Sequence, residues 1–476
     1  MKSGLRNWLF LLLLGVVPAM RGQTPDSRTL FISHVTVVDV ATGKEQSDQT
    51  VVVRGGRIVS VAEATTFPLV PENQNSTDRS SAGETVDGHN GFLIPGLWDM
   101  HVHVQDIADL PLYVANGVTG VRMMSGQKDT RALRSELANA PLEPEIIVAS
   151  AIVDGNPPVW PGSIVVRKAD DARRTVDDIK AGGADFVKVY GGVPRDAYFA
   201  LADEAKKQEI PFVGHLPFAI TAQEASDAGQ RSIEHLDGIA FGCSKREKEL
   251  TRDRQDAPHY VARMRVEAEA YNSIDNTQCL ALMQQFRRNG TWQVPTLTVN
   301  RVIGRLDDRR FTSDPRLTYM AGHVRDRWQN DPRFARGRPE FFALKRSLFA
   351  ADERLVGFMF KAGVPLMAGT DAMNPYCFPG FSLHDELALL VESGLTPLAA
   401  LQAATLNPAL FVDRTLGRIA DQGTITPGKR ANMVLLDADP LTDIHNTTKI
   451  RAVWLEGKYL DRAALDQLLE SAKHRK

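Results

Sequence analysis

The chain of 476 residues contains only three cysteines, too few for a disulfide scaffold or a Cys-x-x-Cys metal site. It also lacks a basic excess. Its 56 lysines and arginines face 58 aspartates and glutamates, so nucleic-acid binding is not expected to be its main activity. With 43% apolar and 24% charged residues, it is neither a disordered chain nor a protein with many membrane spans.

Long apolar runs are also scarce. The run from Trp8 to Met20 is too short to span a bilayer, which needs about 20 residues. A basic start precedes it and small residues follow it, as is typical of a secretory signal peptide. We expect residues 1–22 to be that peptide, cleaved near Ala19 or Gly22. The protein would then be periplasmic or secreted, with no stable membrane span. An uncleaved anchor or a buried helix is the alternative.

The cysteines leave one pairing open. Three cysteines allow at most one internal disulfide, and an exported protein meets an oxidising compartment. A bond between Cys243 and Cys279 is conceivable, but the sequence alone does not decide it.

Short apolar segments alternate with helical patterns through the middle of the chain. Eight such segments separated by helix-length stretches predict an α/β fold, a (β/α)₈ barrel. The expected strands are Leu97–Val104, Gly117–Met123, Glu145–Ala149, Phe186–Tyr190, Phe212–His215, Ser232–His235, Gln293–Leu297 and Leu366–Thr370.

The two ends of the chain read as β structure instead. Strand and hairpin patterns recur within residues 29–93 and 413–462, and we expect the two ranges to pair into one small β-sandwich beside a barrel of residues 94–412. Two stretches, Lys245–Gly290 and Val302–Leu348, are too long for simple connectors. They follow the sixth and seventh expected strands, on the active-site face of a barrel, and we interpret them as lid or specificity insertions. Surface decoration is the alternative.

Metal-ligand side chains recur where these strands end. His101 and His103 are two residues apart, so they lie on one face of a strand. His215, His235 and Asp371 each end a later strand. Catalytic residues of barrels come from the C-terminal ends of several strands, and nitrogen and oxygen ligands suit divalent ions such as Zn²⁺.

Lys188 shares a strand face with Tyr190, pointing to the same interior. A protonated amine has no lone pair for a metal, whereas a lysine carbamate is an anionic oxygen donor. A lysine at the rim, or one paired with Asp371, is the alternative.

Together these residues resemble the amidohydrolase superfamily. The resemblance rests on residues 91–103, Lys188, residues 214–215 and 234–235, and residues 369–371, and it continues through residues 394–408 and 423–434. It covers nearly all of the chain from Thr29 to Asp461. The sequence is most similar to the imidazolonepropionase-related branch that holds Xaa-Pro dipeptidases and carboxypeptidases for basic residues.

The resemblance implies a bent, distorted barrel, a small β-sandwich from both chain ends, and two divalent metal ions, usually zinc. By position, one metal would be held by His101, His103 and Asp371, and the other by His215 and His235. Lys188, N6-carboxylated, would bridge them together with a hydroxide that attacks the substrate. Asp371 would accept the proton and pass it to the leaving amine.

Two further residues are candidates for substrate binding. Tyr190 could donate a hydrogen bond to an oxyanion, as a catalytic group, or to a substrate carboxylate. Arg122 could pair a substrate carboxylate, with a structural salt bridge as its alternative. The expected substrate is a dipeptide or N-acyl amino acid. A hydrolase of cyclic amides or lactones, and a metal-free binding protein on the same scaffold, are the competing hypotheses. A homo-oligomer is compatible with the sequence.

Overall fold

The computed structural model describes residues 29–66, 83–140, 142–331 and 339–475. The expected signal peptide, residues 1–22, lies outside the described residues. Among the residues that are described, no helix combines the length and the apolar character needed to cross a bilayer.

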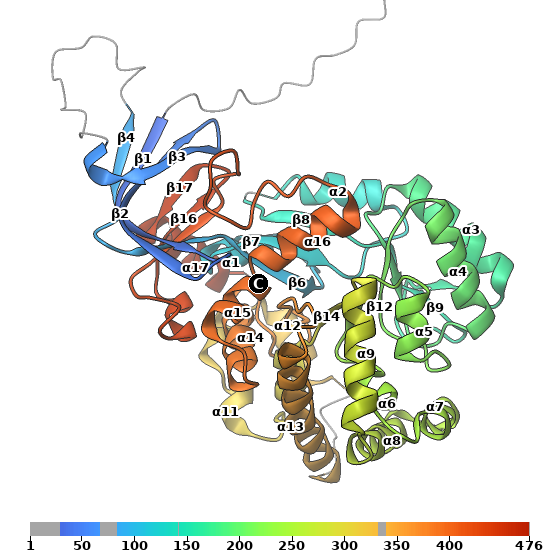
Figure 1. Cartoon of the computed structure of the whole chain (residues 1–476). Coiled ribbons are helices and arrows are strands. Elements are labelled where there is room, and N and C mark those ends of the chain that lie inside the picture. The colour runs from blue at the N-terminus through green and yellow to red at the C-terminus, as the bar shows by residue number, and fades with distance from the viewer. Residues whose placement is uncertain (1–28, 67–82, 141, 332–338, 476) are drawn as a thin grey trace, which may run out of the picture.

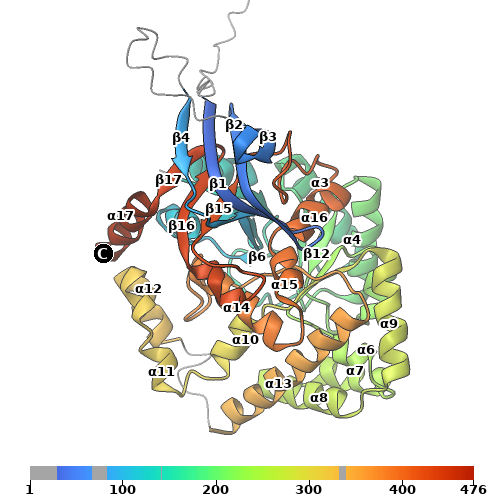
Figure 2. The ribbon, with the colours of Figure 1, turned by 60° about the vertical axis from the view of Figure 1, so that its left-hand side comes forward.

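Strands from both chain ends form one eight-stranded sheet, ordered β17-β16-β15-β5-β1-β2-β3, with β4 beside β1. Figures 1 and 2 both show the blue N-terminal strands beside the red C-terminal ones. The two ends meet where β5 pairs antiparallel with β15. The strands are β1 (Thr29–Asp39), β2 (Lys44–Arg54), β3 (Arg57–Glu63), β4 (Glu84–Asp87), β5 (Phe92–Pro95), β15 (Met433–Leu436), β16 (Ile450–Leu455) and β17 (Lys458–Asp461).

This sheet has its own core. Alternate residues such as Ile32, Val51, Leu93, Met433 and Trp454 come from both chain ends and pack into one buried cluster. The expected small β domain from both chain ends is therefore present, with its strands joined in one continuous hydrogen-bonded sheet.

The barrel strands are parallel and lie in two sheets, β6-β7-β8 and β10-β9-β11-β12-β13-β14. A bridge between Ala149 and Phe186 joins the two. Seven of the eight expected segments contain a strand, and β9 and β10 were not expected. The strands are β6 (Leu97–Val102), β7 (Val118–Met123), β8 (Glu145–Val148), β9 (Val153–Asp154), β10 (Ile164–Val165), β11 (Val187–Val189), β12 (Phe212–Gly214), β13 (Ser232–Glu234) and β14 (Trp292–Val294).

The eighth expected strand, Leu366–Thr370, is not a regular strand. Its backbone nevertheless lies between β14 and β6. The Met367 N–H donates to the Gln293 carbonyl at 2.9 Å, and the Met100 N–H donates to the Ala368 carbonyl at 2.8 Å. The ring is thus completed by single bridges and hydrogen bonds instead of a continuous ladder, which is the distortion expected of this barrel.

Helices cover the outside of the barrel, because each carries an apolar stripe toward the strands. In α3, for example, Ala172, Val176 and Ile179 are buried. These helices, with those that follow the last barrel segment, are α1 (Leu110–Ala115), α2 (Thr130–Leu137), α3 (Ala169–Gly182), α4 (Arg195–Lys207), α5 (Ala222–Asp227), α6 (Ile239–Gly242), α9 (Asn276–Asn289), α14 (Phe381–Glu392), α15 (Pro397–Ala403), α16 (Leu406–Leu416) and α17 (Arg462–Lys473).

The two long insertions are mostly helical and project on one side of the barrel (Figure 1). Both contribute residues to a cavity that also contains the strand-end side chains, so they are more than surface decoration. The first stretch contains α7 (Glu247–Asp256), α8 (Tyr260–Asn272) and α9. The second contains α11 (Arg309–Thr312) and α12 (Gly322–Gln329), and it overlaps α10 (Leu297–Ile303) and α13 (Pro339–Lys361).

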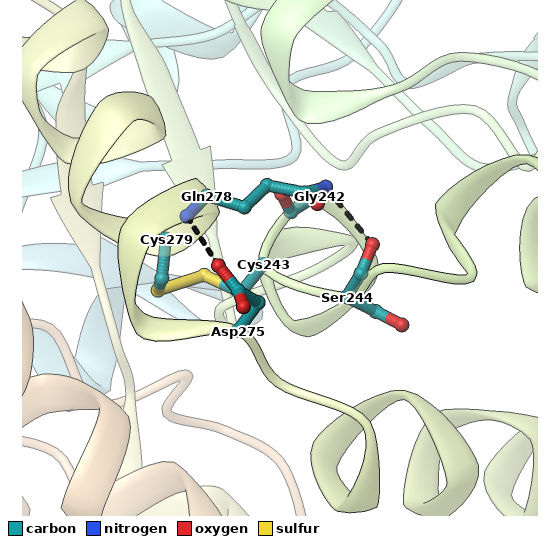
Figure 3. The surroundings of a disulfide bond; sticks show 6 residues. All are labelled: Gly242, Cys243, Ser244, Asp275, Gln278 and Cys279. Atoms are coloured by element: carbon teal, nitrogen blue, oxygen red, sulfur yellow. Dashed lines mark hydrogen bonds between the residues drawn. A yellow bond between two sulfur atoms is a disulfide. The ribbon is translucent and has the colours of Figure 1, made fainter.

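A disulfide bond joins Cys243, just before the first insertion, to Cys279 on α9 (Figure 3). Beside it, the Gln278 side-chain amide donates to the carbonyls of Gly242 and Ser244 at 3.0 and 2.9 Å. The pairing that the sequence left open is therefore formed. Cys377 is buried and unpaired.

Candidate metal centre

The structure brings all six expected metal ligands to one end of the barrel. His101 lies in β6 and His103 directly follows it, while Lys188 lies in β11. His215 and His235 directly follow β12 and β13, and Asp371 follows the irregular eighth segment. Parallel strands place these ends together, which is why residues far apart in the chain meet here.

The four histidine rings form a continuous row. Ring centroids are 5.3 Å apart for His103 and His101, 4.6 Å for His101 and His235, and 4.7 Å for His235 and His215. Burial lowers the pKa of His101 well below its usual value and that of His235 to about 3. Both imidazoles are therefore neutral near pH 7, the form that binds metals.

Each histidine uses Nδ1 for a hydrogen bond within the protein. His101 Nδ1 lies 2.8 Å from Glu234 Oε2, and His215 Nδ1 lies 3.2 Å from Asp237 Oδ2. The hydroxyls of Ser125 and Thr296 lie 2.8 and 2.7 Å from Nδ1 of His103 and His235. Such a partner fixes the ring and its tautomer, leaving Nε2 of each histidine for a metal ion.

Asp371 completes this group. Its Oδ1 lies 2.9 Å from His103 Nε2 and 3.4 Å from His101 Nε2. Ligand atoms of His101, His235 and Asp371 all lie within 4.8 Å of one another. Burial alone would raise the pKa of Asp371, but the neighbouring His235, His103 and Lys188 outweigh it and the pKa is lowered. Asp371 and His235 also adopt positive φ, which is unusual for residues other than glycine and often marks functional sites.

The Lys188 amine is buried with no hydrogen-bond partner among the described residues. Burial lowers its pKa to about 8, so a fraction of the amine is neutral near neutral pH. An isolated buried cation would be costly, whereas a neutral amine can react with carbon dioxide to form a carbamate. This environment fits the expected N6-carboxylated lysine.

These side chains fit a metal centre. The Nζ of Lys188 and the Nε2 of His101 are buried polar atoms without hydrogen-bond partners, and both belong to the expected ligand set. Buried polar groups are nearly always paired, so a cluster of unsatisfied ones is what a metal-binding site would leave. Four imidazoles and a carboxylate with a potential carbamate are donors for divalent ions such as Zn²⁺.

Tyr190 lies beside the metal centre, with its ring centroid 4.2 Å from that of His215. Its hydroxyl accepts a hydrogen bond from Trp160 Nε1 at 3.0 Å, and both residues line the cavity. Burial raises the pKa of the Tyr190 phenol, so the group keeps its proton. Its own O–H therefore remains a donor for a bound substrate.

Arg122 does not reach the cavity. It is completely buried, and its guanidinium donates to both oxygens of Glu234 at 3.0 and 2.9 Å and to Ser232 Oγ at 2.9 Å. Its Nε donates to the Met100 carbonyl at 2.6 Å. This corrects the expectation that Arg122 binds a substrate carboxylate. The alternative, a structural salt bridge, is the one observed.

Sequence analysis missed the residues that orient the ligands. These are Glu234, Asp237, Ser125 and Thr296, the Nδ1 partners described above, and Asp99. The buried Asp99 carboxylate accepts hydrogen bonds from the Thr370 hydroxyl at 2.6 Å and the Thr370 N–H at 3.0 Å. It thereby holds the segment before Asp371 against β6. The sequence offered one signal for two of them: Asp99 and Glu234 are charged residues within otherwise apolar strands, where a charge needs a partner.

Comparison with known proteins gives a family match. The model of the amidohydrolase family matches residues 92–460. Among solved structures, a bottromycin amidohydrolase aligns with a TM-score of 0.68 and 26% identity, covering 94% of this chain and 91% of that one. A Xaa-Pro dipeptidase with bound methionine aligns with a TM-score of 0.62 and 20% identity, covering 91% and 100%. At that identity the second likeness shows the fold alone.

Curated relatives match over shorter stretches. An adenine deaminase of Ligilactobacillus salivarius is 33% identical over 73 residues, which are 15% of this chain and 12% of that protein. An ochratoxinase of Aspergillus niger is 32% identical over 130 residues, or 26% and 25% of the two chains. The aligned parts thus span a quarter or less of these relatives, and they do not transfer an activity.

Proposed function

Because the chain belongs to the amidohydrolase family, we propose that it is an exported, binuclear metal-dependent hydrolase that cleaves an amide bond in a small substrate, such as a dipeptide or an N-acyl amino acid. The observation that carries the proposal is the arrangement of the four histidines. Each has its Nδ1 bonded within the protein, which leaves four Nε2 atoms for metal ions beside Asp371 and Lys188.

The residues divide into two ligand groups. His101, His103 and Asp371 would hold one ion, His215 and His235 the other, and carboxylated Lys188 would bridge them. Two bound cations would polarise the substrate carbonyl and lower the pKa of a water molecule enough for it to attack near neutral pH.

Asp371 and Tyr190 then act on the substrate itself. The lowered pKa of Asp371 keeps its carboxylate ionised, so it can accept a proton from the attacking water and deliver it to the leaving nitrogen. The Tyr190 hydroxyl, with Trp160 donating to its oxygen, can donate to the oxygen on which negative charge develops.

Export is supported by two observations. The basic start and short apolar run of residues 1–22 have the pattern of a signal peptide. The disulfide between Cys243 and Cys279 is of a kind that persists in oxidising compartments. Fractionation of cells that express the whole chain, with N-terminal sequencing of the product, tests this part. Recovery of uncleaved protein in the reducing cytoplasm would contradict it.

The catalytic part is tested on zinc-supplemented protein with a library of dipeptides and N-acyl amino acids. Elemental analysis of the same sample should give about two equivalents of divalent metal per chain, and chelation should remove metal and activity together. Active protein with one equivalent or none would contradict the binuclear centre. Hydrolysis of cyclic amides or lactones alone would move the function to that competing class.

A further inference from the structure

The cavity above the metal centre is much larger than a dipeptide needs. Its volume is about 2270 Å³, whereas typical small-molecule sites occupy about 300–1,000 Å³. Its floor contains Lys188, Tyr190, His215 and Asp371, and its walls come from the two insertions. The insertions therefore shape a wide chamber over the barrel end.

One wall of this chamber is apolar. Its residues come from four inserted helices, α8, α10, α12 and α13, and they pack into one hydrophobic cluster while still facing the cavity. They are Met264, Val299, Ile303, Trp328, Phe341 and Leu348. Each is at most 8% exposed, so the wall is a packed apolar surface that offers van der Waals contacts to an apolar ligand.

Arg263, on α8, has no acidic partner among the described residues. It is half-buried and lines the cavity, with its guanidinium 4.9 Å from the Phe218 ring centroid. Its only hydrogen bond there is a long one of 3.4 Å to the Ala257 carbonyl. Stacking on an aromatic ring leaves the guanidinium edge free to bind a carboxylate with two hydrogen bonds.

The neighbouring arginine is already engaged. Arg254, on α7, stacks on the same Phe218 ring at 5.1 Å and donates to Asp237, the partner of His215. Phe218 lies close to Tyr190, because its N–H donates a hydrogen bond to the carbonyl of Gly191, the residue after Tyr190. Arg263 is thus linked through Phe218 to the Tyr190 and His215 side of the centre, and it is the arginine of this pair that remains available.

Resting on the amide hydrolysis proposed above, we propose that the substrate is an amide with a free carboxylate, which binds Arg263, and a large apolar acyl group, which packs against the wall of α8, α10, α12 and α13. A carboxylate on a half-buried guanidinium forms charge-assisted hydrogen bonds. The apolar group fills space that a short dipeptide would leave to water. Arg263 takes the role that the sequence suggested for Arg122.

The test uses four N-acyl amino acids on zinc-supplemented protein. They combine an acetyl or a large aromatic acyl group with a free or an amidated carboxylate. We expect the aromatic, free-carboxylate compound to have the highest kcat/KM. Arg263→Gln should lower kcat/KM for the free acids by roughly 10- to 100-fold and leave the amidated forms unchanged. Arg265→Gln is the matched control, since Arg265 is an exposed cavity arginine on the same helix.

A second variant tests the role of the apolar wall. Phe341→Ser should lower kcat/KM for the aromatic acyl compounds and spare the acetyl compounds, with thermal unfolding reporting whether the fold is kept. Equal values for free and amidated substrates, or an unchanged preference in Arg263→Gln, would overturn the assignment of Arg263 while amide hydrolysis stands. Equal losses for both acyl groups in a folded Phe341→Ser protein would overturn the role of the wall.

Absence of any amide hydrolysis would instead contradict the proposed function. Binding of the same four compounds, followed by tryptophan fluorescence, then decides the inference separately, because Trp160 and Trp328 both line the cavity. Tighter binding of the free aromatic acid in wild type but not in Arg263→Gln would support it. Equal binding of free and amidated forms would overturn it.

Discussion

Nδ1 of His101 lies 2.8 Å from Oε2 of Glu234, and both side chains are completely buried. The same carboxylate pairs with Arg122 on its other side. A buried carboxylate between an arginine and a histidine is held in place by the arginine, and it in turn fixes the histidine ring. Arg122 thus supports the candidate metal ligand His101 through Glu234, and it does not line the cavity.

Replacing this carboxylate should weaken metal binding. We expect Glu234→Gln to lower metal affinity by about 10- to 100-fold, because a neutral amide accepts a weaker hydrogen bond from His101 than the carboxylate and offers Arg122 only one acceptor oxygen. Competition with a chelator measures the affinity, and thermal unfolding reports the cost of leaving Arg122 without its counter-ion. Ser232→Ala, which removes one donor to Glu234 and one acceptor of Arg122 but leaves both charges in place, should have a smaller effect. Unchanged affinity in Glu234→Gln would show that His101 is oriented by other contacts.

Lys188 should act as a bridging anion. Lys188→Ala is expected to abolish activity, and bicarbonate with a short carboxylic acid should restore part of it by occupying the vacated position. Lys188→Arg keeps a positive charge but cannot form the carbamate, so it should also be inactive. Full activity of the arginine variant would mean that the residue acts as a cation. Carbon-13 NMR with labelled bicarbonate provides a direct signal for the carbamate in wild type.

Asp371 should matter more for turnover than for metal content. Asp371→Asn is expected to lower kcat by at least about 10²-fold, the low end for a lost general acid–base group. Metal content should fall only modestly, since five other ligands remain. Steady-state kinetics and elemental analysis of one preparation separate the two effects. Normal turnover in this variant would show that another base moves the proton.

The disulfide should contribute measurably to stability. It closes a loop with a sequence separation of 36, for which the chain-entropy model gives about 3–4 kcal/mol. The double variant Cys243→Ala, Cys279→Ala should lose about that free energy of unfolding in denaturant titrations. Reduced wild type should behave in the same way. Alkylation of the unfolded, unreduced protein should label one cysteine, Cys377, and a higher number would mean that the bond is not formed in solution.

That the six expected ligand side chains meet at one end of the barrel could be predicted from the sequence for a simple physical reason. Period-two spacing puts His101 and His103 on one strand face, and parallel strands bring their C-terminal ends together. The role of Arg122 was harder to predict, because it depends on a contact with Glu234, which is more than a hundred positions away in the sequence. The irregular segment before Asp371 has strand-like composition, yet its pairing is limited to bridges that the local sequence does not encode. Arg263 carries no local signal, because only the packing of α8 over the barrel brings it to Phe218.

The α7–α8 hairpin leaves the barrel and returns to it at almost the same point. Ser244 and Ile274 form an antiparallel bridge, and the hydroxyls of Ser244 and Ser273 lie 2.6 Å apart. A segment whose ends already touch can be shortened to a tight turn, or exchanged for another of different length, with little entropic penalty for the rest of the chain. Arg263 and Met264 would leave with it, while His215 and His235 would stay on their strands. Arg254, which donates to Asp237, would leave as well, whereas the apolar residues of α10, α12 and α13 would remain. Chimeras that exchange this segment would therefore test the proposed carboxylate contact separately from the rest of the cavity.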